Sequence, residues 1–182
     1  MINKFVFLPP QSDLFAEWIP RLLDSAPGWD IVAPETEAEA RLELADADAA
    51  FGTMTPELIA CAPNLRWLQA PAAAPDAGYY FDELIAHQTK VTNFREIYND
   101  HISVQILTYI LSFTKHSHLY RDFQQKREWR PLDAPHHEIF LPESTVLIIG
   151  IGGIGSETAR LCKATGMQVI GIDARREEKP EW

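Results

Sequence analysis

The chain has 182 residues, which is enough for one domain or two small ones. A hydrophobic fraction of 46% is ample for a core and excludes a disordered chain. The net charge of −10, with most basic residues scattered, argues against nucleic acid or an anionic membrane as a main partner. Cys61 and Cys162 form no metal or redox spacing, and no stretch approaches the roughly 20 apolar residues of a membrane span. We therefore expect a soluble, cytoplasmic α/β protein.

Short strand and helix candidates alternate over the first half of the chain. Thr36 and Glu39 make a capping box, Thr55 precedes a proline at the first helical position, and Pro20 should kink or end the helix that contains it. Alternation at this spacing predicts a parallel sheet with helices on both faces. The expected strands are 4–8, 29–32, 48–51, 65–69 and 90–92, and the expected helices start at 12, 36, 55 and 80.

The pattern changes after residue 97. From about Asn99 to Trp129 there is no proline or glycine, which predicts one helix of about 45 Å. Its first half is apolar almost all round and is expected to be buried between two lobes, whereas its second half is polar. Three prolines make 130–142 a connecting arm. We expect one domain over 1–97 and a second over 98–182.

The segment from Thr145 to Asp173 has the order strand, glycine-rich turn, helix, strand. Gly150, Gly152 and Gly155 form G-x-G-x-x-G, in which the glycines permit a tight turn, backbone approach to a pyrophosphate, and close helix–strand packing. The helix that begins there directs free N–H groups at phosphates, and Asp173 is placed to accept hydrogen bonds from a ribose. The predicted cofactor-binding residues are Gly150, Gly152, Gly153, Ile154, Gly155, Asp173 and Arg175.

Two features bear on which dinucleotide binds. Asp173 favours NAD, because a carboxylate pairs with a free ribose hydroxyl and repels a 2′-phosphate. Arg175 and Arg176 suit a phosphate instead, unless they form an ordinary solvated turn. The sequence therefore predicts NAD, with NADP possible.

In this order, four segments resemble the D-isomer-specific 2-hydroxyacid dehydrogenase family. They are LRWLQAPAAAPD (65–76), VTNFREIYNDHIS (91–103), REWRP (127–131) and the dinucleotide turn. The resemblance implies a flavodoxin-like substrate-binding lobe, a long linking helix, and the first βαβ unit of a truncated Rossmann domain. It implies NAD(P)H-dependent reduction of a small 2-oxo acid to a D-2-hydroxy acid, with the substrate carboxylate on the N–H groups of Ala73 and Ala74. The chain departs from the family pattern at Ala74 and Glu96, where glycine is usual, and at Val104 and Gln105.

The resemblance assigns no catalytic residue to this chain. In such enzymes the arginine, the acid and the histidine lie well beyond the second strand of the nucleotide domain. None of the six histidines has a convincing metal or general-base setting, so we assign neither catalytic nor metal-binding residues. Two strands of a doubly wound sheet also leave apolar edges uncovered. We therefore expect these residues to be the N-terminal part of a longer enzyme.

Other interpretations remain open. One is a non-catalytic dinucleotide-binding module or an inactive truncated homologue. The presence of a catalytic arginine, acid and histidine further along the chain would exclude this interpretation. Another is a different two-lobed NAD enzyme, such as a formate dehydrogenase or an S-adenosylhomocysteine hydrolase. The family resemblance further implies a homodimer for the complete protein, formed through the polar end of the long helix and the arm that contains Trp129, Pro131 and Pro135.

Overall fold

The computed structural model describes residues 3–132 and 138–175. Pro135, His136, His137 and Arg176 lie outside the described residues. The chain divides into two compact units, Met1–Arg95 and Glu96–Trp182. In the described ranges, no helix has both the length and the apolar character needed to cross a membrane.

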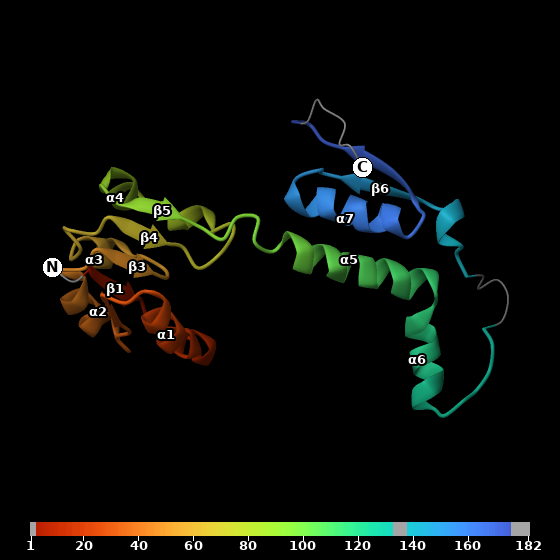
Figure 1. The fold of residues 1–182 in the computed structure, drawn as a ribbon, viewed down its shortest axis with the longest axis horizontal. Helices are drawn as coiled ribbons and strands as arrows, with labels where there is room; N and C mark the ends of the chain where they lie inside the picture. The colour runs from red at the N-terminus through yellow and green to blue at the C-terminus, as the bar shows by residue number, and fades with distance from the viewer. Residues whose placement is uncertain (1–2, 133–137, 176–182) are drawn as a thin grey trace. The chain divides into compact units, whose positions relative to one another are not determined.

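A parallel five-stranded sheet forms the centre of the first unit (Figure 1). The strand order 2-1-3-4-5 is that of flavodoxin-like doubly wound sheets, which confirms the predicted fold class. All pairings are parallel, and Phe5 lies opposite both Ile31 and Ala49. In sheet order the strands are β2 (Trp29–Val32), β1 (Asn3–Phe7), β3 (Ala49–Phe51), β4 (Trp67–Gln69) and β5 (Lys90–Thr92).

Helices cover the two faces of this sheet unequally. Val6, Ala50 and Leu68 face a core completed by α2 (Glu37–Leu44), α3 (Pro56–Ile59) and α4 (Asp82–Ala86), with a short 3-10 turn at Ala77–Tyr79. On the other face, Phe15 of α1 (Asp13–Ser25) packs edge-on against Phe51, with ring centroids 5.0 Å apart. Apolar side chains thus hold helices on both faces, as alternation predicted.

Two of the three local helix predictions are confirmed. Thr36 Oγ1 accepts a hydrogen bond from Glu39 N at 3.3 Å, and Glu39 Oε2 accepts one from Thr36 N at 3.1 Å, which completes the capping box. Thr55 Oγ1 caps α3 by accepting from Leu58 N at 3.3 Å. Of the two outcomes predicted for Pro20, a kink or an end of the helix, the end does not occur, because α1 continues to Ser25. The aromatic packing of α1 on the sheet outweighs the loss of one N–H donor.

The second unit begins with two helices rather than one. The predicted continuous helix from 99 to 129 is wrong: α5 (Asn99–Thr114) and α6 (Ser117–Gln125) are separated at Lys115 and His116. His116 adopts the left-handed conformation with φ of 53°, which histidine tolerates better than most residues and which no helix can include. The absence of proline and glycine was therefore insufficient to predict continuity.

Within the second unit, the first half of this segment is not buried on every side. Ile102, Val104 and Tyr109 are 40%, 54% and 59% exposed. Among the described residues α5 packs one face against α7 (Gly153–Ala164), and Ser103 is fully buried there. Apolar composition on several faces of a helix does not guarantee that each face has a neighbour.

The βαβ unit forms as predicted. Strands β6 (Thr145–Ile149) and β7 (Gln168–Ile172) pair in parallel, and α7 lies between them and α5 (Figure 1). Gly166 follows α7 with φ of 91°, the helix-ending position expected of it. A second 3-10 turn at Leu141–Glu143 precedes β6. One face of this sheet is exposed through alternating side chains, namely Leu147, Ile149, Ile170 and Ile172.

Candidate dinucleotide-binding site

The glycine-rich turn between β6 and α7 requires glycine at two positions for different reasons. Gly150 has φ of 93°, a conformation in which other residues are strained. A Cβ on Gly155 would collide with the carbonyl oxygen of Gly150 and would lie 3.0 Å from its carbonyl carbon. The first glycine reverses the chain, and the last lets α7 begin directly against the turn.

Gly152, Gly153 and Ile154 form the start of α7. Gly152 is the N-cap residue with extended backbone, and a Cβ there would meet nothing within 4 Å. The first N–H groups of a helix lack intrahelical acceptors. An open approach to such N–H groups at the positive end of a helix dipole suits a diphosphate. The residues present therefore fit the predicted cofactor.

Asp173 follows β7 and contacts the turn directly. Its Oδ2 accepts a hydrogen bond from Ile151 N at 2.7 Å, and its Oδ1 accepts one from Arg175 N at 2.8 Å. The structure thus brings Asp173 and Arg175 together beside Gly150. The carboxylate fixes both the backbone of the turn and the residues that follow the strand.

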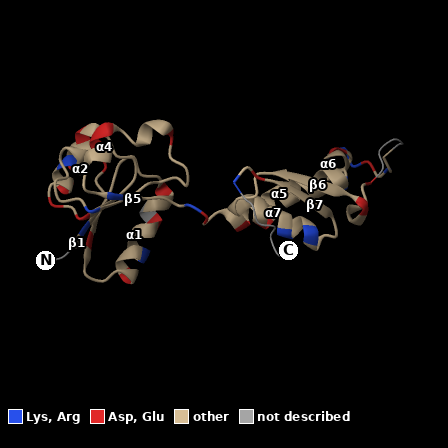
Figure 2. Cartoon of the chain, turned by 90° about the horizontal axis from the view of Figure 1, so that it is seen from above, with Lys and Arg blue, Asp and Glu red and all other residues tan. Residues whose placement is uncertain are grey.

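A hollow of about 490 Å³ opens beside the first turn of α7. Its charged members are all acidic, in a chain whose basic and acidic residues are interspersed (Figure 2). Arg160 donates to both carboxylate oxygens of Glu157, at 2.6 and 2.9 Å, and holds the Glu157 pKa below its ordinary value. The hollow is lined by Glu96, Ile97, Asn99, Asp100, Gly153, Ser156 and Glu157.

Ala73 and Ala74 lie in the first unit, on the loop that follows the carboxyl end of β4. In the described part of the chain, no acceptor is found for either N–H group. Tyr79 anchors the end of this loop, because its hydroxyl donates to Gly52 O at 2.9 Å. Burial, with a smaller contribution from Tyr80, raises the pKa of Tyr79 to about 12. The loop is thus tied at its end while two successive N–H donors are available to a ligand.

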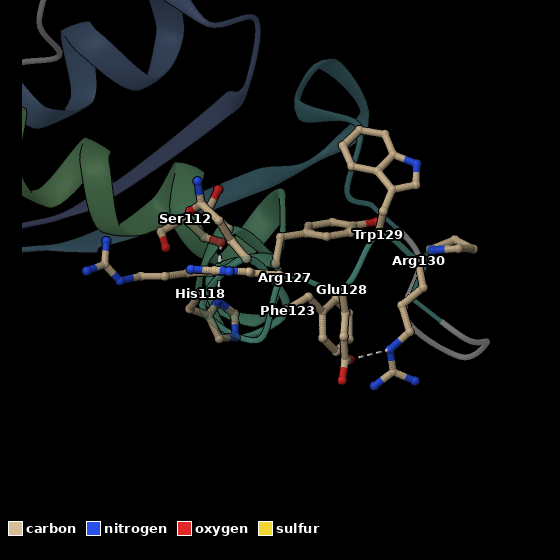
Figure 3. A pocket seen from close by; sticks show the side chains of 12 residues that line it. Ser112, His118, Phe123, Arg127, Glu128, Trp129 and Arg130 are labelled. Carbon is tan, nitrogen blue, oxygen red and sulfur yellow. Dashed lines mark hydrogen bonds and ion pairs between the residues drawn. The ribbon is translucent and has the colours of Figure 1, made fainter.

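A larger hollow of about 1080 Å³ lies on α6 and the following arm (Figure 3). It shares no lining residue with the glycine-rich turn. The Arg130 guanidinium lies 4.2 Å from the centre of the Phe123 ring, Arg130 Nε pairs with Glu128 Oε2 at 3.4 Å, and Trp129 is fully exposed. Sequence reasoning indicated this segment as an interaction surface but predicted no hollow, because the hollow depends on the break at His116.

The described residues contain no group of three or more His, Cys, Asp or Glu side chains that would hold a metal ion. Asn99 and Ser103, which contact the start of α7, were not predicted as part of the site. Ser103 could have been noticed in the sequence, because it is a polar residue on the apolar side of α5.

Residues 107–181 match the NAD-binding domain of the D-isomer specific 2-hydroxyacid dehydrogenases. This part of the chain is thus similar to the NAD-binding domain of that family. The match confirms the resemblance found in the sequence and supports a dinucleotide as cofactor. The matched range contains the whole glycine-rich turn together with Asp173 and Arg175.

Solved structures of this family share the fold over almost all of the chain. A D-isomer specific 2-hydroxyacid dehydrogenase family protein from Aeromonas salmonicida is 25% identical, with a TM-score of 0.76 over 98% of this chain and 56% of its own. A D-lactate dehydrogenase from Treponema pallidum is 25% identical, with a TM-score of 0.78 over 97% of this chain and 54% of its own. A D-lactate dehydrogenase from Aquifex aeolicus, complexed with NAD and lactic acid, shares the fold at 21% identity, with a TM-score of 0.71 over 97% of this chain and 53% of its own. The chain therefore spans little more than half the length of these relatives.

Proposed function

We propose that this chain supplies the cofactor turn and the substrate-carboxylate loop of an NAD-dependent oxidoreductase that reduces a small 2-oxo acid to a D-2-hydroxy acid. The observation that carries the proposal is the arrangement of the turn: Gly155 packs on the Gly150 carbonyl, and Asp173 lies beside both. In this proposal residues 98–182 bind the dinucleotide and residues 1–97 bind the substrate.

The dinucleotide, when bound, supplies the hydride. The chain's own residues orient it. N–H groups of Gly153, Ile154 and Gly155 face the diphosphate at the positive end of α7. The Asp173 carboxylate accepts hydrogen bonds from the adenosine ribose and disfavours a 2′-phosphate, so we propose NAD over NADP.

The substrate contacts in this proposal come from the loop after β4. The N–H groups of Ala73 and Ala74 donate to the substrate carboxylate, a charge-assisted interaction that needs no charged side chain. Small side chains at both positions let a ligand approach the backbone. The arginine, acid and histidine that would polarise the carbonyl and transfer a proton are assigned to no residue of this chain.

Equilibrium titration of the chain with NADH and NADPH tests the cofactor assignment. Saturable binding of NADH that is tighter than binding of NADPH is expected, and no binding of either would contradict the proposal. Turnover of glyoxylate or hydroxypyruvate with NADH would then test the reductase. Binding of NADH without turnover of any 2-oxo acid by the complete protein would favour the alternative, a non-catalytic dinucleotide-binding module.

We propose a homodimer for the complete protein, formed through α6 and the arm that follows it. Support comes from the fully exposed Trp129 beside the aromatic and basic hollow. Analytical ultracentrifugation should give a dimer, and Trp129→Asp should shift it to monomer. Ile85→Asp is the matched control, because Ile85 is 67% exposed on α4 in the first unit. A Trp129→Asp dimer as stable as the unaltered one would contradict this interface.

A further inference from the structure

The start of α5 lies against the first turn of the proposed dinucleotide site. A Cβ on Gly153 would lie 2.8 Å from both Cγ and Oδ1 of Asn99, closer than real Cβ atoms approach other groups. The bare Cα of Gly153 thus accommodates the amide of Asn99, which any side chain at this position would displace.

A buried serine one turn later fixes this contact. Ser103 is fully buried, and its Oγ lies 2.5 Å from Asn99 O and 3.0 Å from Ile154 O. The same hydroxyl thus bridges the backbone of α5 to the backbone of the first turn of α7. Because a buried hydroxyl without partners costs free energy, this bridge keeps the two helices in one register. The backbone of Asn99 is thus held beside the first turn of α7.

The hollow at this point has one uncommitted side-chain donor. Glu96, Asp100 and Glu157 carry only acceptors when ionised. Ser156 Oγ is engaged with Ile151 O at 3.2 Å. In the described part of the chain, no hydrogen-bond partner is found for the half-buried amide of Asn99. Its Nδ2 therefore has protons available beside the N–H groups of α7.

We propose that Asn99 is a further cofactor-binding residue, whose side-chain Nδ2–H donates to the diphosphate of the bound dinucleotide. The proposal rests on the proposed function and adds to it a contact from outside the fingerprint. The amide adds a neutral donor to a hollow whose charged lining residues, Glu96, Asp100 and Glu157, are all acidic and would repel a diphosphate.

Titration of the full chain and its variants with NADH tests this role. Asn99→Ala should weaken NADH binding roughly tenfold to a hundredfold, the range for one hydrogen bond to a charged group. Asn99→Asp keeps the shape but replaces the donor by a negative charge, and should weaken binding more than Asn99→Ala does. Because Asn99→Asp adds a carboxylate beside Glu96 and Asp100, urea unfolding of this variant separates a loss of binding from a loss of folding. Gln105→Ala is the control, because Gln105 is exposed on α5 and does not line the hollow.

Adenosine distinguishes a cofactor contact from a structural effect, since it lacks the diphosphate. Its binding, measured by chemical-shift titration, should be the same for the unaltered chain, Asn99→Ala and Asn99→Asp. Equal NADH affinity of Asn99→Asp and the unaltered chain would overturn the proposal while leaving the proposed function intact. If the Asn99 variants lost affinity for adenosine and for NADH equally, the proposal would also be overturned, and Asn99 would have a structural role. Failure of the unaltered chain to bind NADH would instead remove the proposed function and the inference together.

Discussion

The carboxylate of Asp173 accepts a hydrogen bond from the backbone N–H of Ile151, with 2.7 Å between oxygen and nitrogen. The residue that would recognise the ribose therefore also holds the backbone of the glycine-rich turn. Its second oxygen accepts from Arg175 N at 2.8 Å, which orients the carboxylate. The charge of Asp173 should determine the choice of cofactor, whereas its acceptor oxygens should stabilise the turn. The substitutions Asp173→Asn and Asp173→Ala separate these two effects.

Asp173→Asn should change cofactor preference while keeping the glycine-rich turn, because the amide oxygen of Asn still accepts from Ile151 N; only the hydrogen bond from Arg175 N is lost. Removing the charge removes repulsion of a 2′-phosphate, so the NADPH-to-NADH affinity ratio should rise about tenfold. Asp173→Ala leaves the Ile151 N–H without its acceptor and should also lower the free energy of unfolding by roughly 1.5–3 kcal/mol. Titrations with both cofactors and urea unfolding of both variants measure these effects. An unchanged affinity ratio in Asp173→Asn would show that Asp173 does not face the ribose.

Two glycines of the turn should respond differently to alanine. Gly155→Ala places a Cβ on the backbone of Gly150, which cannot yield, so the free energy of unfolding should fall by roughly 3 kcal/mol. Gly152→Ala meets nothing within 4 Å and should change stability by less than about 0.5 kcal/mol. That Cβ projects into the space proposed for the diphosphate, however, and NADH affinity should fall more than tenfold. Urea unfolding and NADH titration check both, and a Gly152→Ala chain that binds NADH normally would place the diphosphate elsewhere.

Local patterns predicted most of the elements because each depends on nearby residues. The capping box at Thr36, the proline after Thr55 and the helix-ending Gly166 act within one turn of the chain, and the structure has all three helix ends where expected. The parallel sheet followed from the alternation of strands and helices, and its flavodoxin-like character from the family resemblance. The sequence also placed the fingerprint and Asp173 in one site, because the βαβ unit is compact in sequence.

Features that depend on distant neighbours were not predicted. The bridge from Ser103 to Ile154 joins residues far apart in the chain, so no short pattern contains it. The end of α5 at His116 depends on one left-handed residue that carries no strong sequence signal. The contact of Asn99 with Gly153 is likewise a product of helix packing rather than of the fingerprint.

Glu96 has φ of 71°, a left-handed conformation that glycine adopts without strain. For a residue with a Cβ this conformation costs about 1–2 kcal/mol. Glu96→Gly should therefore be more stable than Glu96→Ala by about 1 kcal/mol, since both lose the same carboxylate and only glycine loses the strain. Urea unfolding of the two variants measures the difference. At Glu35, an exposed residue outside the left-handed region, the order should reverse, because there glycine only adds freedom to the unfolded chain. Equal stability of the two Glu96 variants would contradict the prediction.

Tyr79 should make the first unit sensitive to alkaline pH. Burial raises its pKa to about 12, from an ordinary value of 10.0. Between these pH values the unfolded chain releases the phenolic proton while the folded chain keeps it, so the free energy of unfolding falls as pH rises. The loss should be on the order of 2 kcal/mol by pH 12.

Tyr79→Phe removes this titration together with the hydrogen bond to Gly52 O. At pH 8 the variant should be less stable by about 1 kcal/mol, because the carbonyl loses its donor. Near pH 12 the difference in stability should vanish or reverse, because only the unaltered chain loses stability through the raised pKa of Tyr79. Urea unfolding at pH 8, 10 and 11.5 measures the gap, with Tyr109→Phe as control because Tyr109 is 59% exposed. A gap that stays constant across this pH range would mean that the phenol of Tyr79 ionises equally in both states.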